Sequence, residues 1–317
     1  MRKILYKILF SVSFLFLIFF YLGFNADLSS PDVRNMILYI RLPRLILALL
    51  TGAGLSLSGA VMQTLFRNPL ADPYMLGISG GALFGAMLSK LIFGGSIIIS
   101  VLFSFIFACA AFFSSLILAR TIKGDRRFTL IMSGLILNIL FSSLVVILSI
   151  MMKNDAKNLF YMLMGSLNFI MIKNHSSVYF FSILLLLSAF AFSLFKSREL
   201  DLMSFGDENA YSSGIDAGKT FFVMMLVSVL IVSVLVSFSG IIGFVGVLIP
   251  NMARISGSRK HMRLLLDSLL YGSFALLISD FVAKNLMDFE LPVGVVTSIV
   301  GIPFLYFVMK RNSNASD

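Results

Sequence analysis

The chain has 317 residues, of which 59% are hydrophobic and 13% are charged, and its mean hydropathy is +0.99. A soluble globular domain has about 45–50% apolar and about 25% charged residues, so this composition excludes that class. It predicts an all-α polytopic membrane protein, because strands of a membrane barrel would alternate in polarity over about ten residues. The net charge of +10 does not indicate nucleic-acid binding, since the basic residues fall in short loops between apolar runs.

The first apolar run follows Arg2 and Lys3 and covers about residues 4–24. A basic start followed by an apolar run is also typical of a signal peptide. This run is long for a signal peptide, and it lacks a clear Ala-x-Ala cleavage site. We therefore expect a retained first helix with a cytoplasmic N-terminus.

The remaining apolar runs predict about ten membrane-spanning helices in total, with both termini in the cytoplasm. The piece 159–172 is short for a span and predicts an interfacial or surface helix. We expect one transmembrane domain over residues 1–317. The predicted helices after the first cover about residues 42–66, 74–93, 96–119, 128–150, 178–195, 220–238, 240–253, 264–284 and 290–309.

The distribution of basic residues supports this orientation. About two thirds of the 25 Lys and Arg residues fall on the side that it places in the cytoplasm, as the positive-inside rule requires. Arg41 and Arg44 are exceptions, because they lie at the start of the second predicted helix on the opposite side.

Small residues recur at close spacing in three stretches, which we expect to be sites of helix packing. In lipid, small residues let helix backbones approach closely. The general packing of a polytopic protein explains them as well as any special role does. The stretches contain Gly52, Ser56 and Ala60, then Gly77, Gly81 and Gly85, and later Gly240, Gly243 and Gly246.

A polar elbow, Arg67-Asn68-Pro69-Leu70-Ala71-Asp72-Pro73, separates the second and third predicted helices. Pro69 and Pro73 each remove a backbone donor and disfavour helix at the preceding residue. Irregular backbone at membrane depth is tolerated only where it is buried in protein or lines water. The elbow therefore suits a gate in a transport path, and a plain turn is the alternative.

Several motifs fall in one order along the chain: R-L-P-R at 41–44, S-G-A-x-x-Q at 58–63, the elbow, and Ser-Gly with a later Pro at 239–250. This order resembles the FecCD family of ABC-importer permeases, which serve iron–siderophore, haem and vitamin B12 uptake. The motif-bearing core covers about residues 41–311. Where many members of the family carry His after the proline of the last motif, this chain has Asn251.

The resemblance implies a permease in the cytoplasmic membrane of a bacterium, acting as a homodimer, with a pair of different permease subunits as the alternative. It implies two ABC ATPase subunits and an extracytoplasmic substrate-binding protein as partners, with no cofactor and no enzymatic activity in the chain itself. An iron–siderophore or haem is the first expectation for the ligand, and cobalamin the next. ATP hydrolysis must be supplied by a separate subunit, because Gly214 to Thr220 resembles a P-loop but has three residues between its glycines instead of four.

The resemblance also implies docking of the binding protein at Arg41, Arg44 and Lys284. Arginine suits this role because its planar fork grips a carboxylate with two hydrogen bonds. Many members of the family have Arg where this chain has Lys284. Anchoring to lipid headgroups is the alternative for the two arginines, and a pair with Asp280 is the alternative for Lys284.

Two further sites follow from the resemblance. A cytoplasmic gate is implied at Asn68, Pro69 and Leu70, and at Arg127, Phe128 and Thr129 where another helix starts. A coupling segment that docks on the ATPase is implied within the loop of about residues 196–219. A plain turn and a solvated loop are the alternatives for these sites. The coupling residues are Gly206, Asp207, Glu208, Asn209, Ala210, Ser213 and Gly214.

Three other classes of function compete with the importer. An ion-coupled secondary transporter needs ionisable residues near the membrane midplane, and the predicted helices have almost none there. A membrane enzyme needs a nucleophile, an acid–base pair or a metal cluster. Cys109 lies in an apolar run, His175 and His261 fall in predicted loops, and no metal site is indicated. A purely structural subunit is the third alternative, which transport activity would exclude.

Overall fold

The computed structural model of the chain describes residues 2–24, 35–94, 96–152, 156–167, 176–287 and 289–313. These residues form helices joined by short turns, and no strand occurs among them, which confirms the predicted all-α fold. The elements are α1 (Arg2–Gly23), the π-helical turn η1 (Ile37–Arg41), α3 (Leu42–Leu65), α4 (Ile78–Phe93), α5 (Ile97–Thr121), α6 (Arg126–Met151), α7 (Ala156–Met164), α8 (Ser176–Phe195), α9 (Ser197–Ser204), α10 (Asp207–Ser212), α11 (Ala217–Ser239), α12 (Val245–Ile255), α13 (His261–Asn285) and α14 (Val293–Ser313).

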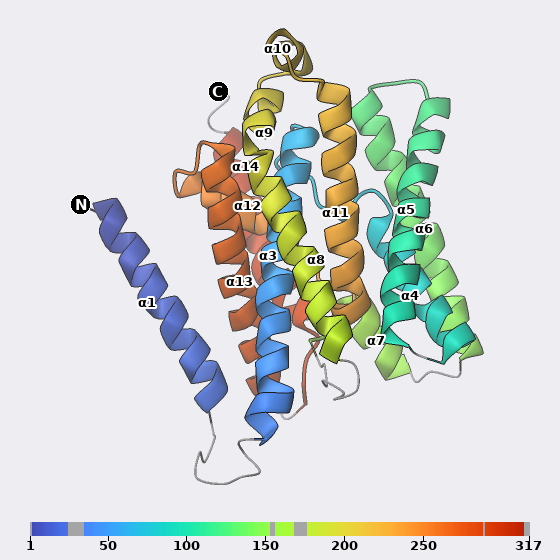
Figure 1. Ribbon diagram of the computed structural model, residues 1–317, viewed down its shortest axis with the longest axis vertical. Coiled ribbons are helices and arrows are strands. Elements are labelled where there is room, and N and C mark those ends of the chain that lie inside the picture. The colour runs from blue at the N-terminus through green and yellow to red at the C-terminus, as the bar shows by residue number, and fades with distance from the viewer. Residues whose placement is uncertain are drawn as a thin grey trace.

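Helix α3 is the centre of the structure (Figure 1). It packs against α11, α12 and α13, and most of its residues are buried. Helices α4, α5 and α6 pack against one another as a second group, which joins the first through α11. Helix α1 lies at the edge of the bundle beside α13 and α3 (Figure 1). The core therefore follows α3, the helix that carries the S-G-A-x-x-Q motif.

Five helices in the described part of the chain are long and apolar enough to cross a membrane, and α8 with α9, which meet at a bend of 52°, would make a sixth span. Shorter apolar helices occupy the other predicted spans. The number of crossings and the cytoplasmic position of both termini stay predictions. The start of α1 and the end of α14 lie in the half of Figure 1 that holds α10. The five helices are Ile37–Leu65, Ile97–Thr121, Arg126–Met151, Ala217–Ser239 and His261–Asn285, and the shorter ones are Val12–Gly23, Ile78–Phe93, Val245–Ile255 and Val293–Phe307.

The central helix begins before the predicted residue 42, because η1 runs into α3 without a break. The Leu42 N–H bonds to the carbonyl of Ile37, five residues back, in a wide π-helical turn. Pro43 has no N–H with which to continue an ordinary helical turn, so the wider turn occurs where the regular pattern is already interrupted. Arg41 and Arg44 consequently lie within a continuous helix and not at its start.

Gly52 and Ser56 lie where α3 crosses α13. A Cβ on Gly52 would lie 2.1 Å from the carbonyl oxygen of Gly272, and a Cβ on Gly272 would lie 2.2 Å from the carbonyl oxygen of Gly52. The Ser56 hydroxyl is 2.7 Å from the Ser268 carbonyl at the same crossing. The two backbones are therefore in direct contact, as close packing in a membrane requires.

Replacing Gly52 by alanine is expected to destabilise the protein by about 3 kcal/mol, at the upper end for overpacking, because the atom in the way belongs to a backbone and cannot rotate aside. Gly243→Ala is the matched control, since nothing lies within 4 Å of a Cβ at Gly243. The measurement is the apparent melting temperature in detergent. Equal melting temperatures for the two variants would contradict the packing argument.

The other predicted packing glycines divide into groups. Gly81 and Gly85 bring α4 onto α5, because a Cβ at either one would lie 2.5 Å or 2.3 Å from a carbonyl oxygen of α5. Gly77 precedes α4 with a left-handed φ of 75°, which glycine adopts most easily. Gly246 is in tight contact with the elbow, because a Cβ on Gly246 would lie 2.6 Å from the Cδ of Pro73. Gly243 differs from all of these, because nothing lies within 4 Å of a Cβ there, and its carbonyl accepts a hydrogen bond from the Thr297 hydroxyl at 3.0 Å.

The predicted helix from Gly240 begins five residues later than expected, at Val245. Gly240 and Phe244 have φ values of 67° and 70°, which interrupt the helix. The freed backbone groups bond elsewhere in the protein: the Ile241 N–H donates to the Met162 carbonyl at 3.2 Å. The break therefore joins the start of α12 to the end of α7.

The short piece around α7 is more than a surface helix. The helix ends at Met164, and the Ser166 N–H then donates to the Ser239 carbonyl at 2.8 Å. Leu167 is fully buried. These contacts bind the end of the piece into the packed interior, whereas the rest of the predicted 159–172 segment, from residue 168 on, lies outside the described residues.

Candidate functional site

The elbow after α3 is a series of hydrogen-bonded turns. Arg67 has a left-handed φ of 48°, a conformation that costs a non-glycine residue about 1–2 kcal/mol. The Asn68 side-chain oxygen accepts a hydrogen bond from the Leu70 N–H at 2.9 Å. The Asp72 carboxylate accepts one from the Tyr74 N–H at 2.8 Å. The elbow is therefore an ordered structure that holds Arg67 in a strained conformation.

Asp72 titrates at a higher pH than an ordinary carboxylate. Burial raises the pKa of Asp72 to about 6, and the hydrogen bond from Tyr74 offsets only part of that increase. Burial also raises the pKa of the Tyr74 phenol, with the Asp72 charge as the second cause. The carboxylate remains mostly charged at neutral pH, where its role is to close the turn of the elbow.

Helix α12 holds the elbow through Asn251. The Asn251 amide nitrogen donates to the Pro69 carbonyl at 2.8 Å and to the Val247 carbonyl at 2.8 Å, and the residue is 7% exposed. Both partners are acceptors, so this position needs a hydrogen-bond donor and no titrating group. Asn251 thus ties one of the predicted gate residues to α12.

Gln63 of the S-G-A-x-x-Q motif holds the start of α12. Its amide nitrogen lies 3.4 Å from the Gly246 carbonyl and 3.1 Å from the Val247 carbonyl. Pro250 has no N–H, so the Gly246 carbonyl lacks its usual donor within the helix, and Gln63 supplies one. Gly59 permits the approach, because a Cβ there would lie 1.9 Å from the Gly246 oxygen. The motif is thus explained by one helix crossing.

Three charged residues meet at the α10 end of the bundle, and we call them the Asp207 cluster: Arg67, Arg127 and Asp207. The Asp207 carboxylate pairs with Arg67 at 2.5 Å and with Arg127 at 2.9 Å and 3.0 Å. Arg67 also donates to the Met203 carbonyl at 3.2 Å. One carboxylate of the predicted coupling segment therefore binds both predicted gates, the elbow and the start of α6.

The other predicted coupling residues build the short helix α10 and its ends. Gly206 and Gly214 have left-handed φ values of 128° and 80° on either side of it. Ala210 is fully buried, whereas the rings of Phe205 and Tyr211 are 74% and 57% exposed. The polar members stabilise the turn or face solvent: Asn209 donates to the Phe205 carbonyl, Ser213 to the Asn209 carbonyl, and Glu208 is exposed.

The second predicted gate opens α6. Asp125 caps the helix by accepting from the N–H groups of Arg127 at 3.0 Å and Phe128 at 2.9 Å. The Phe128 side chain is 60% exposed, and Thr129 is 3% exposed. Only Arg127 of the three predicted gate residues reaches the coupling segment, whereas Phe128 presents an apolar ring at the surface.

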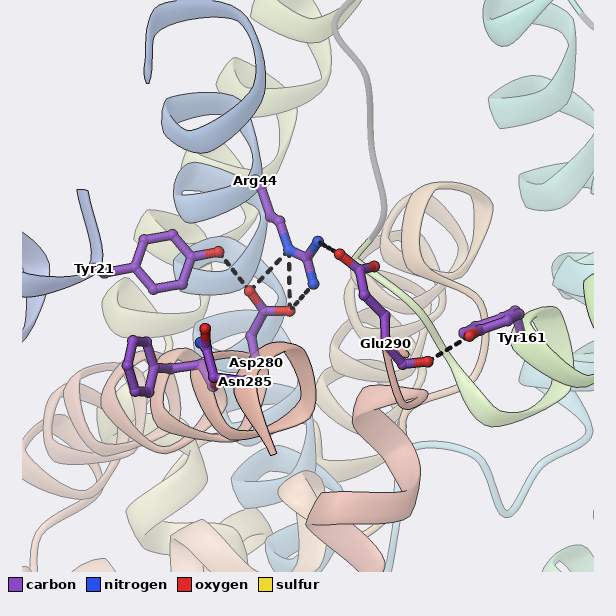
Figure 2. A network of polar contacts seen from close by, with 7 residues as sticks. Tyr21, Arg44, Tyr161, Asp280, Asn285 and Glu290 are labelled. Atoms are coloured by element: carbon purple, nitrogen blue, oxygen red, sulfur yellow. Dashed lines mark hydrogen bonds and ion pairs between the residues drawn. The ribbon is translucent and has the colours of Figure 1, made fainter. Parts of the chain in front are cut away.

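A buried polar network lies at the opposite end of α3, and we call it the Arg44 cluster: Tyr21, Arg44, Asp280 and Glu290 (Figure 2). The Arg44 guanidinium pairs with Asp280 at 2.8 Å and with Glu290 at 3.1 Å. The Tyr21 hydroxyl donates to Asp280 at 2.5 Å. Arg44 is 5% exposed and Asp280 is 0% exposed. The cluster therefore joins α1, α3 and α13 with a charge pair that is closed to solvent.

Arg44 pairs with the carboxylate that the sequence assigned, as an alternative, to Lys284. That alternative is wrong, because Asp280 binds Arg44 from a position 236 residues away in the chain. Figure 2 shows the guanidinium reaching between Asp280 and Glu290, and Tyr161 donating to the backbone carbonyl of Glu290. In this conformation the predicted docking residue Arg44 forms ion pairs within the protein.

Arg41 is also engaged within the chain. Its guanidinium donates to the carbonyl of Leu22 at 2.8 Å and to that of Phe24 at 2.7 Å. These carbonyls end α1, where backbone acceptors lack partners within the helix. Lys284 is half-buried and lies within electrostatic reach of Arg41 and Arg44. The three predicted docking cations are therefore neighbours, and two of them hold α1 and α13 in place.

Two contacts were not anticipated from the sequence. His261 is the first residue of α13, not a loop residue, and its ring lies 2.7 Å from Asp201 and 2.8 Å from the Thr64 hydroxyl. The second is the pair of Arg67 with Asp207, because the sequence places Arg67 in the elbow but does not mark it as a site residue. A basic residue at the turn between two apolar helices is the signal that could have marked it.

These features define a multi-pass α-helical membrane protein whose irregular elbow is bonded to a short polar surface helix. Comparison with known proteins identifies the class further. The model of the FecCD transport family matches residues 5–311, so the chain belongs to that family, as its motifs predicted.

Two curated relatives show the range within the family. A probable iron chelatin transport system permease protein of Helicobacter pylori is 38% identical over 90% of this chain and 85% of its own length. The molybdate import system permease protein of Haemophilus influenzae is 34% identical over 89% of this chain and 84% of its own length. A solved structure, described as an inward-facing conformation of a putative metal-chelate type ABC transporter, matches with a TM-score of 0.83 at 29% identity and covers 98% of this chain and 100% of its own.

Proposed function

We propose that this chain is the permease subunit of an ABC importer, acting as a homodimer in the cytoplasmic membrane with two ATPase subunits and an extracytoplasmic substrate-binding protein. Family membership over residues 5–311 and the likeness to a metal-chelate type ABC transporter support this function. The observation that carries it is the Asp207 cluster, in which a helix with exposed apolar side chains is ion-paired to the elbow and to α6.

The proposed mechanism couples the ATPase to the gates through α10. The exposed rings of Phe205, which follows α9, and of Tyr211 in α10 form an apolar surface suited to a protein partner. When the ATPase subunits close, they displace α10, and the Asp207 carboxylate transmits the movement to Arg67 and Arg127. Because Arg67 belongs to the elbow and Arg127 starts α6, one displacement shifts both gates together.

For the cargo we propose a metal chelate, with an iron chelate first. The relative from Helicobacter pylori and the similar solved transporter of metal-chelate type favour it. The molybdate permease at 34% identity shows that family membership alone leaves the cargo open. Haem and cobalamin are the next candidates, from the resemblance of the motifs.

The test is purification of the tagged full-length chain from its native membranes, followed by uptake assays in proteoliposomes. We expect an ABC ATPase to co-purify in stoichiometric amount. ATP-driven uptake should then be measured with ferric citrate, a ferric siderophore, haemin, cobalamin and molybdate. A chain that purifies alone, with no ATP-dependent uptake of any of the five, would contradict the proposal.

An ion-coupled transporter remains the second candidate, and Asp280 is the observation that could favour it. A buried carboxylate in a membrane helix is a common site of ion coupling. Asp280 is, however, bonded to Arg44 and Tyr21, so it is neutralised within the chain. Uptake that collapses with the proton gradient but persists without ATP would support this second function.

We expect Lys284→Glu to weaken docking of the substrate-binding protein by about tenfold, because it reverses a charge beside Arg41 and Arg44 on the predicted outer side. Lys284 is half-buried and forms no ion pair within the described residues, so the change does not break a pair. The measurement is the dissociation constant of the binding protein for the permease in nanodiscs, and Lys284→Arg is the control that keeps the charge. An unchanged constant for Lys284→Glu would remove Lys284 from the docking surface.

A further inference from the structure

A cavity of about 560 Å³ lies at the α10 end of the bundle between α5, α6 and α11. Its apolar wall includes Phe112, Phe113, Ile117 and Phe222. The rings of Phe113 on α5 and Phe222 on α11 are 6.2 Å apart, and these residues are 43% and 40% exposed. Ile117, one turn further along α5, is 66% exposed. The cavity therefore opens along a surface of apolar side chains typical of lipid contact.

The other wall of the cavity is basic. Arg120 lies in the last turn of α5, and Arg126 and Arg127 start α6. Arg127 is paired with Asp207, but Arg120 and Arg126 are exposed and form no ion pair within the described part of the chain. Asp125 also lines the cavity, and its carboxylate accepts hydrogen bonds from two backbone N–H groups of α6. Two guanidinium groups are thus available at the mouth of an apolar cavity.

We propose that this cavity binds an anionic phospholipid, with its phosphate at Arg120 and Arg126 and an acyl chain between α5 and α11. A guanidinium matches the geometry of phosphate oxygens with two parallel hydrogen bonds. Basic pockets between membrane helices are typical sites for anionic headgroups. The inference needs only that the helices cross a bilayer, so it does not depend on the proposed cargo or on the ATPase.

The proposed lipid site lies next to α10 and the Asp207 cluster. Asp207 and Tyr211 of α10 line the same cavity as Arg127. A bound lipid would therefore lie against α10 and support the Asp207 cluster from the membrane side.

The chain contains no tryptophan, which allows a direct test with a single introduced fluorophore. The full-length Phe222→Trp variant is placed in nanodiscs that contain phosphatidylglycerol or phosphatidylcholine with brominated acyl chains, and quenching reports lipid contact at the cavity. Phe180→Trp is the matched control, since Phe180 on α8 is 70% exposed and lies outside the cavity. We expect phosphatidylglycerol to be preferred about tenfold or more at Phe222, and no preference at Phe180.

The Arg120→Gln and Arg126→Gln substitutions, made together in the Phe222→Trp background, should remove the preference, because each basic residue beside an anionic lipid contributes about fivefold in affinity. The same preference at Phe222 and Phe180, or a preference that persists without the arginines, would overturn the proposal. Two further outcomes would also overturn it. One is displacement by inorganic phosphate, which would indicate a site for a free anion, and the other is loss of quenching when the ATPase is added, which would assign the cavity to a protein partner.

Discussion

Replacing Arg44 by methionine is expected to destabilise the protein by about 3–5 kcal/mol, because it leaves the Asp280 carboxylate buried without its cation. Asp280 is 0% exposed, and the contacts from Arg44 lie at 3.2, 3.0 and 2.8 Å. Tyr21 then remains as a hydrogen-bond donor to Asp280 but supplies no charge. The measurement is the apparent melting temperature of the purified protein in detergent, which we expect to fall on the order of 10 °C.

Two further variants separate the charge effect from other causes. Arg198→Met removes an exposed arginine and should leave the melting temperature nearly unchanged. A combined Tyr21→Phe, Arg44→Met and Asp280→Leu variant removes the network as a whole and should recover most of the lost stability, since apolar replacements of a buried ion pair are often neutral. The role of the pair would be refuted if Arg44→Met melted at the same temperature as Arg198→Met.

The Arg44 cluster changes how docking of a binding protein can be tested. Arg44→Glu would break the ion pairs with Asp280 and Glu290, so lost transport would report on folding. Arg41→Glu would remove the donor that caps the end of α1. Lys284 is the one of the three whose substitution breaks no ion pair in the described part of the chain, so it is the informative position.

Much of the fold could be predicted from the sequence, because hydrophobic length and proline position are local properties. The helices and the elbow follow from them. One error in a helix boundary arose where a backbone group bonds to a distant partner. The helix predicted from Gly240 starts at Val245 because the Ile241 N–H bonds to Met162, a residue nearly eighty positions earlier in the chain. The other error is local, because the π-helical turn before Pro43, in which the Leu42 N–H bonds to the Ile37 carbonyl, places Arg41 and Arg44 within the helix.

The candidate site was predicted in pieces, and its connections were not. Asp207 and Arg127 were singled out separately, as coupling and gate residues. Their pairing, and the part played by Arg67, depend on three segments that meet only after folding. The same holds for Arg44 and Asp280. The spacing of one helical turn between Asp280 and Lys284 favours a local pair, but Asp280 binds the distant Arg44 instead. Spacing in the sequence indicates which face a charge occupies, but not which helix lies opposite.

Asp207→Asn is expected to reduce ATP-driven uptake by about tenfold or more while ATP hydrolysis continues. The substitution keeps the shape of the side chain but removes the charge that binds Arg67 and Arg127. Because the Asp207 side chain is 49% exposed, its ion pairs contribute little to stability, at most about 1 kcal/mol. A large loss of transport with a small change in melting temperature would therefore indicate coupling and not misfolding. The measurements are uptake, ATP hydrolysis and melting temperature on the same reconstituted complex.

Asp207→Glu is the conservative control, since it keeps the carboxylate and should retain much of the uptake. The decisive comparison is a double-mutant cycle with Arg67→Gln and Arg127→Gln. If Asp207 acts through the two arginines, removing all three charges should cost little more than removing Asp207 alone, because the interactions are shared. Fully additive losses would mean instead that Asp207 contacts the ATPase directly, and that the gates receive the movement of α10 by another route.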